Sequence, residues 1–279
     1  MNAQELLSRY STGIRDFRQG DLVGADLSGQ DLRDVNLRRV DLSRTNLQNT
    51  NLMGANLRET NLTGADLQGA LLSQANLIGA QLHHAKLQNA DLSESGLRGA
   101  RMTEANLVNA ILKAANLAEA TLDRANLSGA VLTDATLNRA KLIGSNLTKA
   151  NLDGTNLSNA LLNEACLEAA SLVHAILHGA NLEEADLRHA DLSRARLTSA
   201  TLINVNLSHA NVREANLSWT SLRGATLQKT NFYRARLSWA NLSEADLTEA
   251  VLLNAQINQV NFQNANLTGT LMPDGIAHE

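Results

Sequence analysis

The stretch Ala25-Asp26-Leu27-Ser28-Gly29 is the clearest copy of a five-residue phrase that repeats through nearly the whole chain. Centred on its large apolar residue, the phrase recurs at every fifth position from Phe17 to Leu267, which makes 51 consecutive repeats without an insertion. Leu occupies 45 of these centres, and the other six are also apolar. Two positions before the centre (position −2), 36 of the 51 residues are Ala. A register kept this strictly decides the fold.

A strict period of five fits neither an α-helix, with a period of about 3.6, nor a long β-strand, with a period of about 2. Within one repeat, positions −2 and 0 are apolar, and position −1 is mostly Asn or Asp, which is the alternation of a very short strand. Positions +1 and +2 carry small or polar residues that suit a turn. Each repeat therefore predicts one short extended side and a corner. Stacked coils of such sides can bury the Leu and Ala faces, as in a solenoid.

The phrase Ala-(Asp/Asn)-Leu-X-X, over residues 15–269, resembles the signature of the pentapeptide-repeat family. The resemblance implies an all-β fold, a right-handed quadrilateral β-helix with four repeats per coil, and therefore about 13 coils. The lead-in Leu6-Leu7-Ser8-Arg9-Tyr10 and the stretch Met272-Pro273-Asp274-Gly275 resemble the ends of cyanobacterial members. Among those members are the HetL-like regulators of heterocyst differentiation.

The ends of the repeat predict three segments. Residues 1–14 are predicted as a short N-terminal capping helix and lead-in, because Leu6, Leu7 and Tyr10 share one helical face and a solenoid needs its first coil covered. A helix that docks a partner is the alternative. Residues 15–272 are predicted as one pentapeptide-repeat β-helix. Residues 273–279 are predicted as a loose C-terminal tail, because Pro273 cannot donate to a ladder.

Composition narrows the class of protein. The net charge of −4, from 28 acidic and 24 basic residues, provides no basic footprint for nucleic acid. The single cysteine, Cys166, excludes an intramolecular disulfide and favours the reducing cytoplasm. No apolar run is long enough for a membrane span. The early Glu5 and the lack of a long apolar stretch argue against a signal peptide.

One cluster of surface residues predicts a partner-binding patch near the C-terminal end. Trp219 and Trp239 occupy the same turn position one coil apart, so their rings are expected to stack. Tyr233 and Arg234 lie on the side before Trp239, and Arg236 starts the next side. Trp, Tyr and Arg dominate the hot spots of protein interfaces, and clustered exposed aromatics mark interaction sites. The alternatives are that these residues shield the late coils or form a self-association surface.

A second candidate surface is a set of apolar residues at the outward position −1. Leu71, Ile111, Val131 and Val251 fall on one face by the step of twenty residues, and Leu161 and Ile176 lie elsewhere. A flat apolar strip predicts a weak homodimer face. The alternative is that these are single exposed aliphatic side chains, which are normal on any protein.

No constellation of residues predicts catalysis, a cofactor or a metal site. His189 and His209 fall one coil apart, but two histidines without a third ligand make a poor metal site. Cys166 lies more than a third of a coil from His174 and His178, too far for a nucleophile pair. Glycines recur at the second turn position and form no phosphate loop. A filled core also leaves no cleft in which catalytic groups could converge.

These observations favour a non-catalytic protein-interaction scaffold or regulator that binds another protein, as a monomer or a weak homodimer. The HetL-like ends imply, as that partner, a transcriptional regulator in cyanobacterial cell differentiation. The alternative is a DNA-mimic inhibitor of DNA gyrase, an activity of some pentapeptide-repeat proteins. Mimicry needs a dense anionic surface, whereas acids and bases are nearly balanced here. An enzyme and a purely structural filament are further alternatives with less support.

Overall fold

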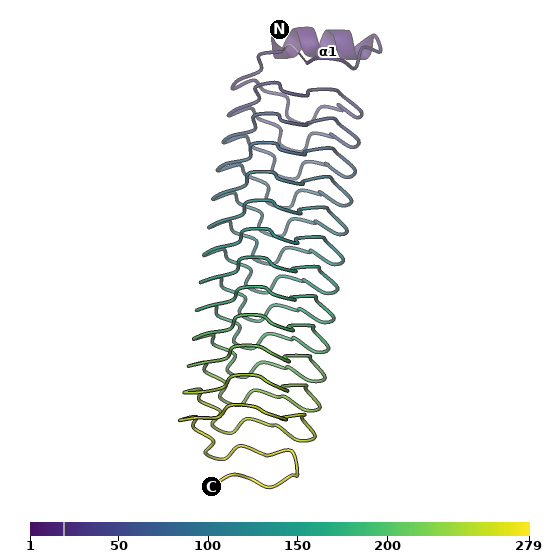
Figure 1. Ribbon diagram of the computed structural model, residues 1–279. Helices are drawn as coiled ribbons and strands as arrows, with labels where there is room; N and C mark the ends of the chain where they lie inside the picture. The colour runs from purple at the N-terminus through teal and green to yellow at the C-terminus, as the bar shows by residue number, and fades with distance from the viewer. Residues whose placement is uncertain (19) are drawn as a thin grey trace. The chain divides into compact units, whose positions relative to one another are not determined.

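The computed structural model describes residues 1–18 and 20–279, and these residues form two compact units, Met1–Lys141 and Leu142–Glu279. In both units most repeats place one residue in a parallel β-bridge with the residue twenty positions later. Asn56 pairs in this way with Asn76 in the first unit, and Asn206 pairs with Thr226 in the second. One coil therefore takes twenty residues, or four repeats, and successive coils stack within each unit (Figure 1). The predicted solenoid of short sides is confirmed.

The core of each unit is the inside of the coil. Every repeat centre from Leu22 to Leu252 is at most 1% exposed, and the small residues at position −2 are buried beside them. The interior is close-packed, so each short side accommodates one large side chain and one small one. This is why Ala alternates with Leu and why Thr, Ser and Val are its replacements.

The corner of each repeat centred on Leu22 to Leu267 is a type II turn. The N–H group at position −2 donates to the carbonyl of the preceding centre, as from Ala55 to Leu52 at 3.0 Å. The residue at position +2 has a φ between 55° and 68° in every repeat from Gly24 to Gly269, whereas position +1 does not share this positive φ. A positive φ at the second central residue alone is the mark of a type II turn. Most of these left-handed positions carry residues other than Gly, which the sequence analysis did not foresee.

The polar residue at position −1 stabilises the turn that follows it. Its side-chain oxygen accepts a hydrogen bond from the backbone N–H two residues on, as from Ser43 to Asp41 at 2.8 Å and from Arg58 to Asn56 at 3.3 Å. Asn and Asp make this short-range contact readily, whereas larger side chains do not. Asn or Asp at this position therefore stabilises the turn, which also forms where position −1 is apolar, as at Leu71.

The helix α1, Ala3–Ser11, precedes the first coil and lies across it (Figure 1). The side chain of Asn2 caps the helix by accepting from the N–H of Glu5 at 2.9 Å. Leu6 is fully buried, and the hydroxyl of Tyr10 donates to the carbonyl of Arg33 at 2.9 Å. The predicted helix is present and covers apolar side chains. With nine residues α1 is far too short to cross a membrane, and no other helix among the described residues could do so.

The C-terminal residues are ordered, so the prediction of a loose tail is wrong. Ala277 forms an antiparallel bridge with Leu271, and the N–H of His278 donates to the carbonyl of Thr270 at 2.8 Å. The returning tail exchanges backbone hydrogen bonds with residues 269 and 270 and so pairs with backbone groups at the edge of the coil. Pro273 cannot donate, but its carbonyl accepts from the N–H of Asn254 at 3.1 Å.

Candidate functional site

The tryptophan pair lies on the second unit in the predicted arrangement. The ring centroids of Trp219 and Trp239 are 4.9 Å apart with an angle of 3° between the ring planes, so the predicted stacking is confirmed. The two residues remain 59% and 51% exposed. Both occupy position +2 with a φ of 63°, a conformation that is unusual for a bulky residue. The coil thus presents an apolar ridge that no part of its own unit covers.

Tyr233 is held by two arginines. The guanidinium carbon of Arg234 lies 4.9 Å from the centroid of the Tyr233 ring, and that of Arg213 lies 5.0 Å from it. Both distances suit a cation–π interaction. Arg213 was not among the predicted patch residues. It occupies the same turn position as Tyr233 one coil earlier, so the step of twenty residues could have identified it.

The predicted patch consists of two adjacent sets rather than one contiguous cluster. Arg236 occupies position −1 of the repeat in which Trp239 is the second turn residue, and Arg234 precedes it at the neighbouring corner. Arg234 and Arg236 line an open depression of about 470 Å³. Among the described residues, no ring contact or hydrogen bond joins the tryptophans to Tyr233. We call Trp219, Tyr233, Arg234, Arg236 and Trp239 the aromatic–arginine surface.

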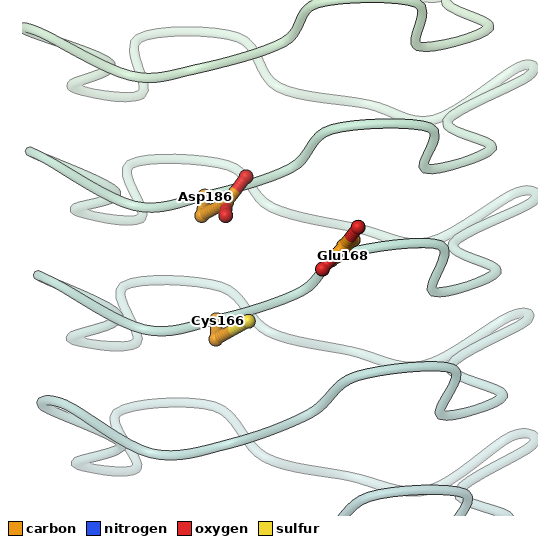
Figure 2. A group of neighbouring side chains, drawn as sticks. All are labelled: Cys166, Glu168 and Asp186. Atoms are coloured by element: carbon orange, nitrogen blue, oxygen red, sulfur yellow. The ribbon is translucent and has the colours of Figure 1, made fainter.

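One group of potential metal ligands was missed by the sequence analysis. Cys166, Glu168 and Asp186 offer ligand atoms within 4.8 Å of one another, and Figure 2 shows their side chains on two successive coils. Cys166 and Asp186 are bridge partners, so only the step of twenty residues reveals that they are neighbours. The sequence search considered histidines around Cys166 and not carboxylates.

The carboxylates of this group already have a cationic partner. The Arg188 guanidinium contacts both Asp186 oxygens at 2.6–3.0 Å and lies 3.7 Å from Glu168. These hydrogen bonds hold the pKa of Asp186 below its usual value. The Cys166 sulfur lies 3.2 Å from the Thr148 hydroxyl. The group is therefore a surface ion-pair network, in which a metal ion would have to displace Arg188.

The predicted histidine pair is stacked, whereas the predicted apolar strip is not continuous. The rings of His189 and His209 stack with centroids 5.0 Å apart. In the first unit Leu71 and Ile111 are each 41% exposed, but Asp91 lies between them in the bridge ladder. A half-exposed carboxylate in the middle interrupts the apolar strip, and this weakens the case for a dimer face.

The chain was compared with known proteins. The family model for pentapeptide repeats matches in overlapping segments that together cover residues 16–272. Among curated proteins, none has a sequence similar enough to match.

Three solved structures are similar to the chain. HetL, a pentapeptide repeat protein involved in heterocyst differentiation regulation from the cyanobacterium Nostoc sp. strain PCC 7120, is 31% identical over 100% of both chains, with a TM-score of 0.37. Rfr23 from the cyanobacterium Cyanothece 51142 is 33% identical over 30% of this chain and 59% of its own, with a TM-score of 0.26. QnrB1, a plasmid-mediated fluoroquinolone resistance protein, is 15% identical over 72% of this chain and 90% of its own, with a TM-score of 0.40.

The repeat register, the twenty-residue coil and the sequence matches agree. The family model covers far more than half of the chain, and HetL matches it from end to end. The chain belongs to the pentapeptide-repeat family.

Proposed function

We propose that the protein is a non-catalytic interaction scaffold that regulates another protein by binding it at the aromatic–arginine surface. The observation that carries the proposal is the stacked pair of Trp219 and Trp239, more than half exposed in a chain with only 3% aromatic residues. Exposed tryptophans beside arginines are typical of the energetic centre of an interface. A solvent-exposed ridge of this kind gains free energy when a partner covers it.

The architecture supports such a role. The proposed form of the solenoid is a right-handed quadrilateral β-helix, supported by four bridges and four turns in each twenty-residue coil. Because side chains fill the interior of the coil, a partner would bind to its outer surface. Similarity to HetL supports a regulatory role in cyanobacterial cell differentiation. The partner that we propose for this role is a transcriptional regulator.

Mimicry of DNA is disfavoured by the pairing of surface charges. Many of the acidic side chains that would have to imitate phosphates are held by arginines. Examples of such pairs are Asp31 with Arg33 at 2.7 Å, Glu119 with Arg98 at 3.2 Å and Glu214 with Arg194 at 2.9 Å. A paired carboxylate projects little negative potential. Purified protein is therefore expected to leave the supercoiling activity of DNA gyrase unchanged, and potent inhibition would support the alternative function.

Affinity capture with matched variants tests the proposal. The bait is the full chain, as wild type and as the double variant Trp219→Asn/Trp239→Asn, used on lysate from a heterocyst-forming cyanobacterium. Asn tolerates the left-handed turn position, where it already occurs at Asn159 and Asn204. The control is Glu164→Asn/Glu184→Asn, which changes the same turn position in two successive coils on another side. The captured protein is then purified and its Kd measured by calorimetry.

We expect the wild type and the control to bind the same protein with similar Kd. The double tryptophan variant is expected to bind at least about tenfold more weakly, because removing a hot-spot aromatic costs about 2 kcal/mol or more. Equal affinity of all three proteins would remove the tryptophans from the binding site. Circular dichroism of each variant shows whether the coil is intact.

A further inference from the structure

A cluster of five exposed arginines overlaps the aromatic–arginine surface and lines two open depressions. The cluster consists of Arg194, Arg196, Arg213, Arg234 and Arg236, all from three successive coils of the second unit. Arg194, Arg196, Arg234 and Arg236 line the depression of about 470 Å³, and Arg194 and Arg213 line a second one of about 300 Å³. Only two carboxylates line these depressions, Glu214 and Asp191. The local charge is thus positive on a chain whose net charge is −4.

Among the described residues, four of these five guanidinium groups have no carboxylate partner. Glu214 is bound to Arg194 at 2.9 Å. The oxygen of Asp191 already accepts hydrogen bonds from the backbone and hydroxyl of Ser193 and from the side chain of Asn211. Within the part of the chain that the structure describes, the other four arginines form no ion pair. The four are Arg196, Arg213, Arg234 and Arg236. An exposed guanidinium without a counter-charge is available to a ligand.

The backbone places these arginines at regular intervals. Arg196 and Arg236 both form bridges to Asn216, one from the coil before it and one from the coil after it. Neighbouring strands lie about 4.8 Å apart, so the two arginines stand about 10 Å apart along the stack. Three residues of an extended peptide cover about the same length. Each guanidinium can bind one carboxylate through two parallel hydrogen bonds.

We infer that the arginine cluster binds an acidic segment of the partner protein, while the stacked tryptophans contact an apolar part of the same partner. The inference rests on the proposed function and names the chemistry of the partner. Charge complementarity supports it, because four unpaired arginines face solvent beside an uncovered aromatic ridge. Cation–π contacts to Tyr233 orient Arg213 and Arg234 without neutralising their charge.

A nucleic acid fits the same surface less well. Proteins that bind single strands stack bases on free aromatic faces, whereas Trp219 and Trp239 cover each other's inner faces with an angle of 3° between the ring planes. A DNA duplex carries a charge about every 1.7 Å and extends far beyond a cluster that spans three coils. Beyond the cluster, a long polyanion would meet a chain of net negative charge.

Fluorescence anisotropy with two anionic probes tests the inference. The probes are a fluorescein-labelled oligoglutamate of about 12 residues and an oligo(dT) of about 12 nucleotides. The test variant of the full chain is Arg196→Gln/Arg213→Gln/Arg234→Gln/Arg236→Gln. The control changes four exposed arginines of the first unit, Arg44→Gln/Arg101→Gln/Arg124→Gln/Arg139→Gln, and alters the net charge equally. All eight positions are exposed. Thermal unfolding of each variant checks that it folds.

We expect oligoglutamate to bind the wild type in a salt-dependent manner. The Kd for oligoglutamate is expected to rise by about tenfold or more in the cluster variant and by less than about threefold in the control. Equal losses in both variants would show that bulk charge, and not this site, attracts the peptide. Tighter binding of oligo(dT) than of oligoglutamate by the wild type, lost in the cluster variant, would assign the site to nucleic acid and overturn the inference.

The captured partner separates this inference from the proposed function. If the tryptophan variant loses the partner and the cluster variant keeps it, the acidic-segment inference fails and the scaffold function stands. If the tryptophan variant and the cluster variant both lose the partner and the control keeps it, the scaffold function and the acidic-segment inference are both supported. If neither variant loses the partner, both the proposed function and the inference are wrong for this surface. The single variant Arg236→Glu is a milder change, and it is also expected to raise the Kd for oligoglutamate.

Discussion

At the scale of the residue, the turn position +2 shows how the fold determines backbone conformation. From Gly24 to Gly269 every such residue has a left-handed φ, whether it is Gly, Asn, Glu, Arg or Trp. A left-handed conformation costs a residue with a Cβ about 1 kcal/mol or more. The coil tolerates that cost because a backbone hydrogen bond closes the turn, as from Ala55 to Leu52, and because the N–H at position +2 donates to the next coil, as from Gly54 to Ser73. Trp219 and Trp239 occupy such positions, so their presence is not explained by local preference.

Two glycines of one coil distinguish the effect of a positive φ on stability from the effect of the room available for a Cβ atom. Gly99 has a φ of 65°, and a Cβ there would meet nothing within 4 Å. Gly96 has no positive φ, and its nearest neighbour would be the Ile78 side chain at 3.7 Å, an ordinary contact. Gly99→Ala is expected to lower the free energy of unfolding by about 1 kcal/mol. Gly96→Ala is expected to raise it by about 0.5 kcal/mol, through the less flexible unfolded chain. Urea unfolding checks both values, and changes of the same sign would contradict this account.

At the scale of the element, the coil depends on which side of the backbone each side chain takes. Position −1 faces out, and positions −2 and 0 face in, so adjacent residues of one type have opposite environments. Leu71 is 41% exposed, whereas Leu72 is completely buried. An inward position can also hold a hydroxyl if a hydrogen bond satisfies it. Thr60 occupies such a position, and its Oγ1 donates to the carbonyl of Leu37 in the previous coil at 2.9 Å.

The adjacent pair provides a matched test. Leu72→Ala is expected to lower the free energy of unfolding by about 3 kcal/mol, because it leaves a cavity in a rigid interior. Leu71→Ala removes the same atoms from an exposed site and is expected to change it by less than about 0.5 kcal/mol. Equilibrium unfolding in urea, followed by circular dichroism, measures both. Similar losses for the two variants would show that Leu71 is covered in solution, as in the dimer that the apolar strip predicted.

At the scale of the whole molecule, the aspartates at position −1 link stability to pH. Hydrogen bonds from the Ser43 side chain and backbone hold the pKa of Asp41 below its usual value, and those from Ser28 do the same for Asp26. In the second unit Arg188 lowers the pKa of Asp186. Most repeats use Asn at this position instead, which accepts the same hydrogen bond without titrating.

Acid is therefore expected to destabilise the protein. A carboxylate with a lowered folded-state pKa contributes stability above its unfolded pKa of about 3.9 and loses it as pH falls through the folded value. The thermal midpoint is expected to fall steeply below about pH 4. Asp26→Asn/Asp41→Asn/Asp186→Asn is expected to flatten that decline. Glu164→Gln, at an exposed turn position, is the control. An unaltered pH profile of the triple variant would contradict the role of these hydrogen bonds.

The amino-acid sequence by itself determined the coil. A five-residue period with Leu at the centre and Ala two positions earlier predicted a coil of short sides, and the twenty-residue coil that the family resemblance implied then predicted the stacking of Trp219 on Trp239. Inward and outward positions were predictable for the same reason, because a side chain on a short strand alternates with its neighbours. The capping helix followed from helical spacing before the repeat begins.

Contacts between chain segments were decided only by the tertiary structure. The tail folds back to Leu271 because the last coil leaves backbone groups unsatisfied, which no local pattern records. The left-handed turns arise because hydrogen bonds within and between coils require that backbone conformation, whatever conformation the residue at position +2 would prefer by itself. The four unpaired arginines are distinguishable from paired ones only once carboxylate distances are known, because pairing depends on side-chain reach between coils. Periodicity specifies which residues are neighbours, and three-dimensional packing decides which of those neighbours bind one another.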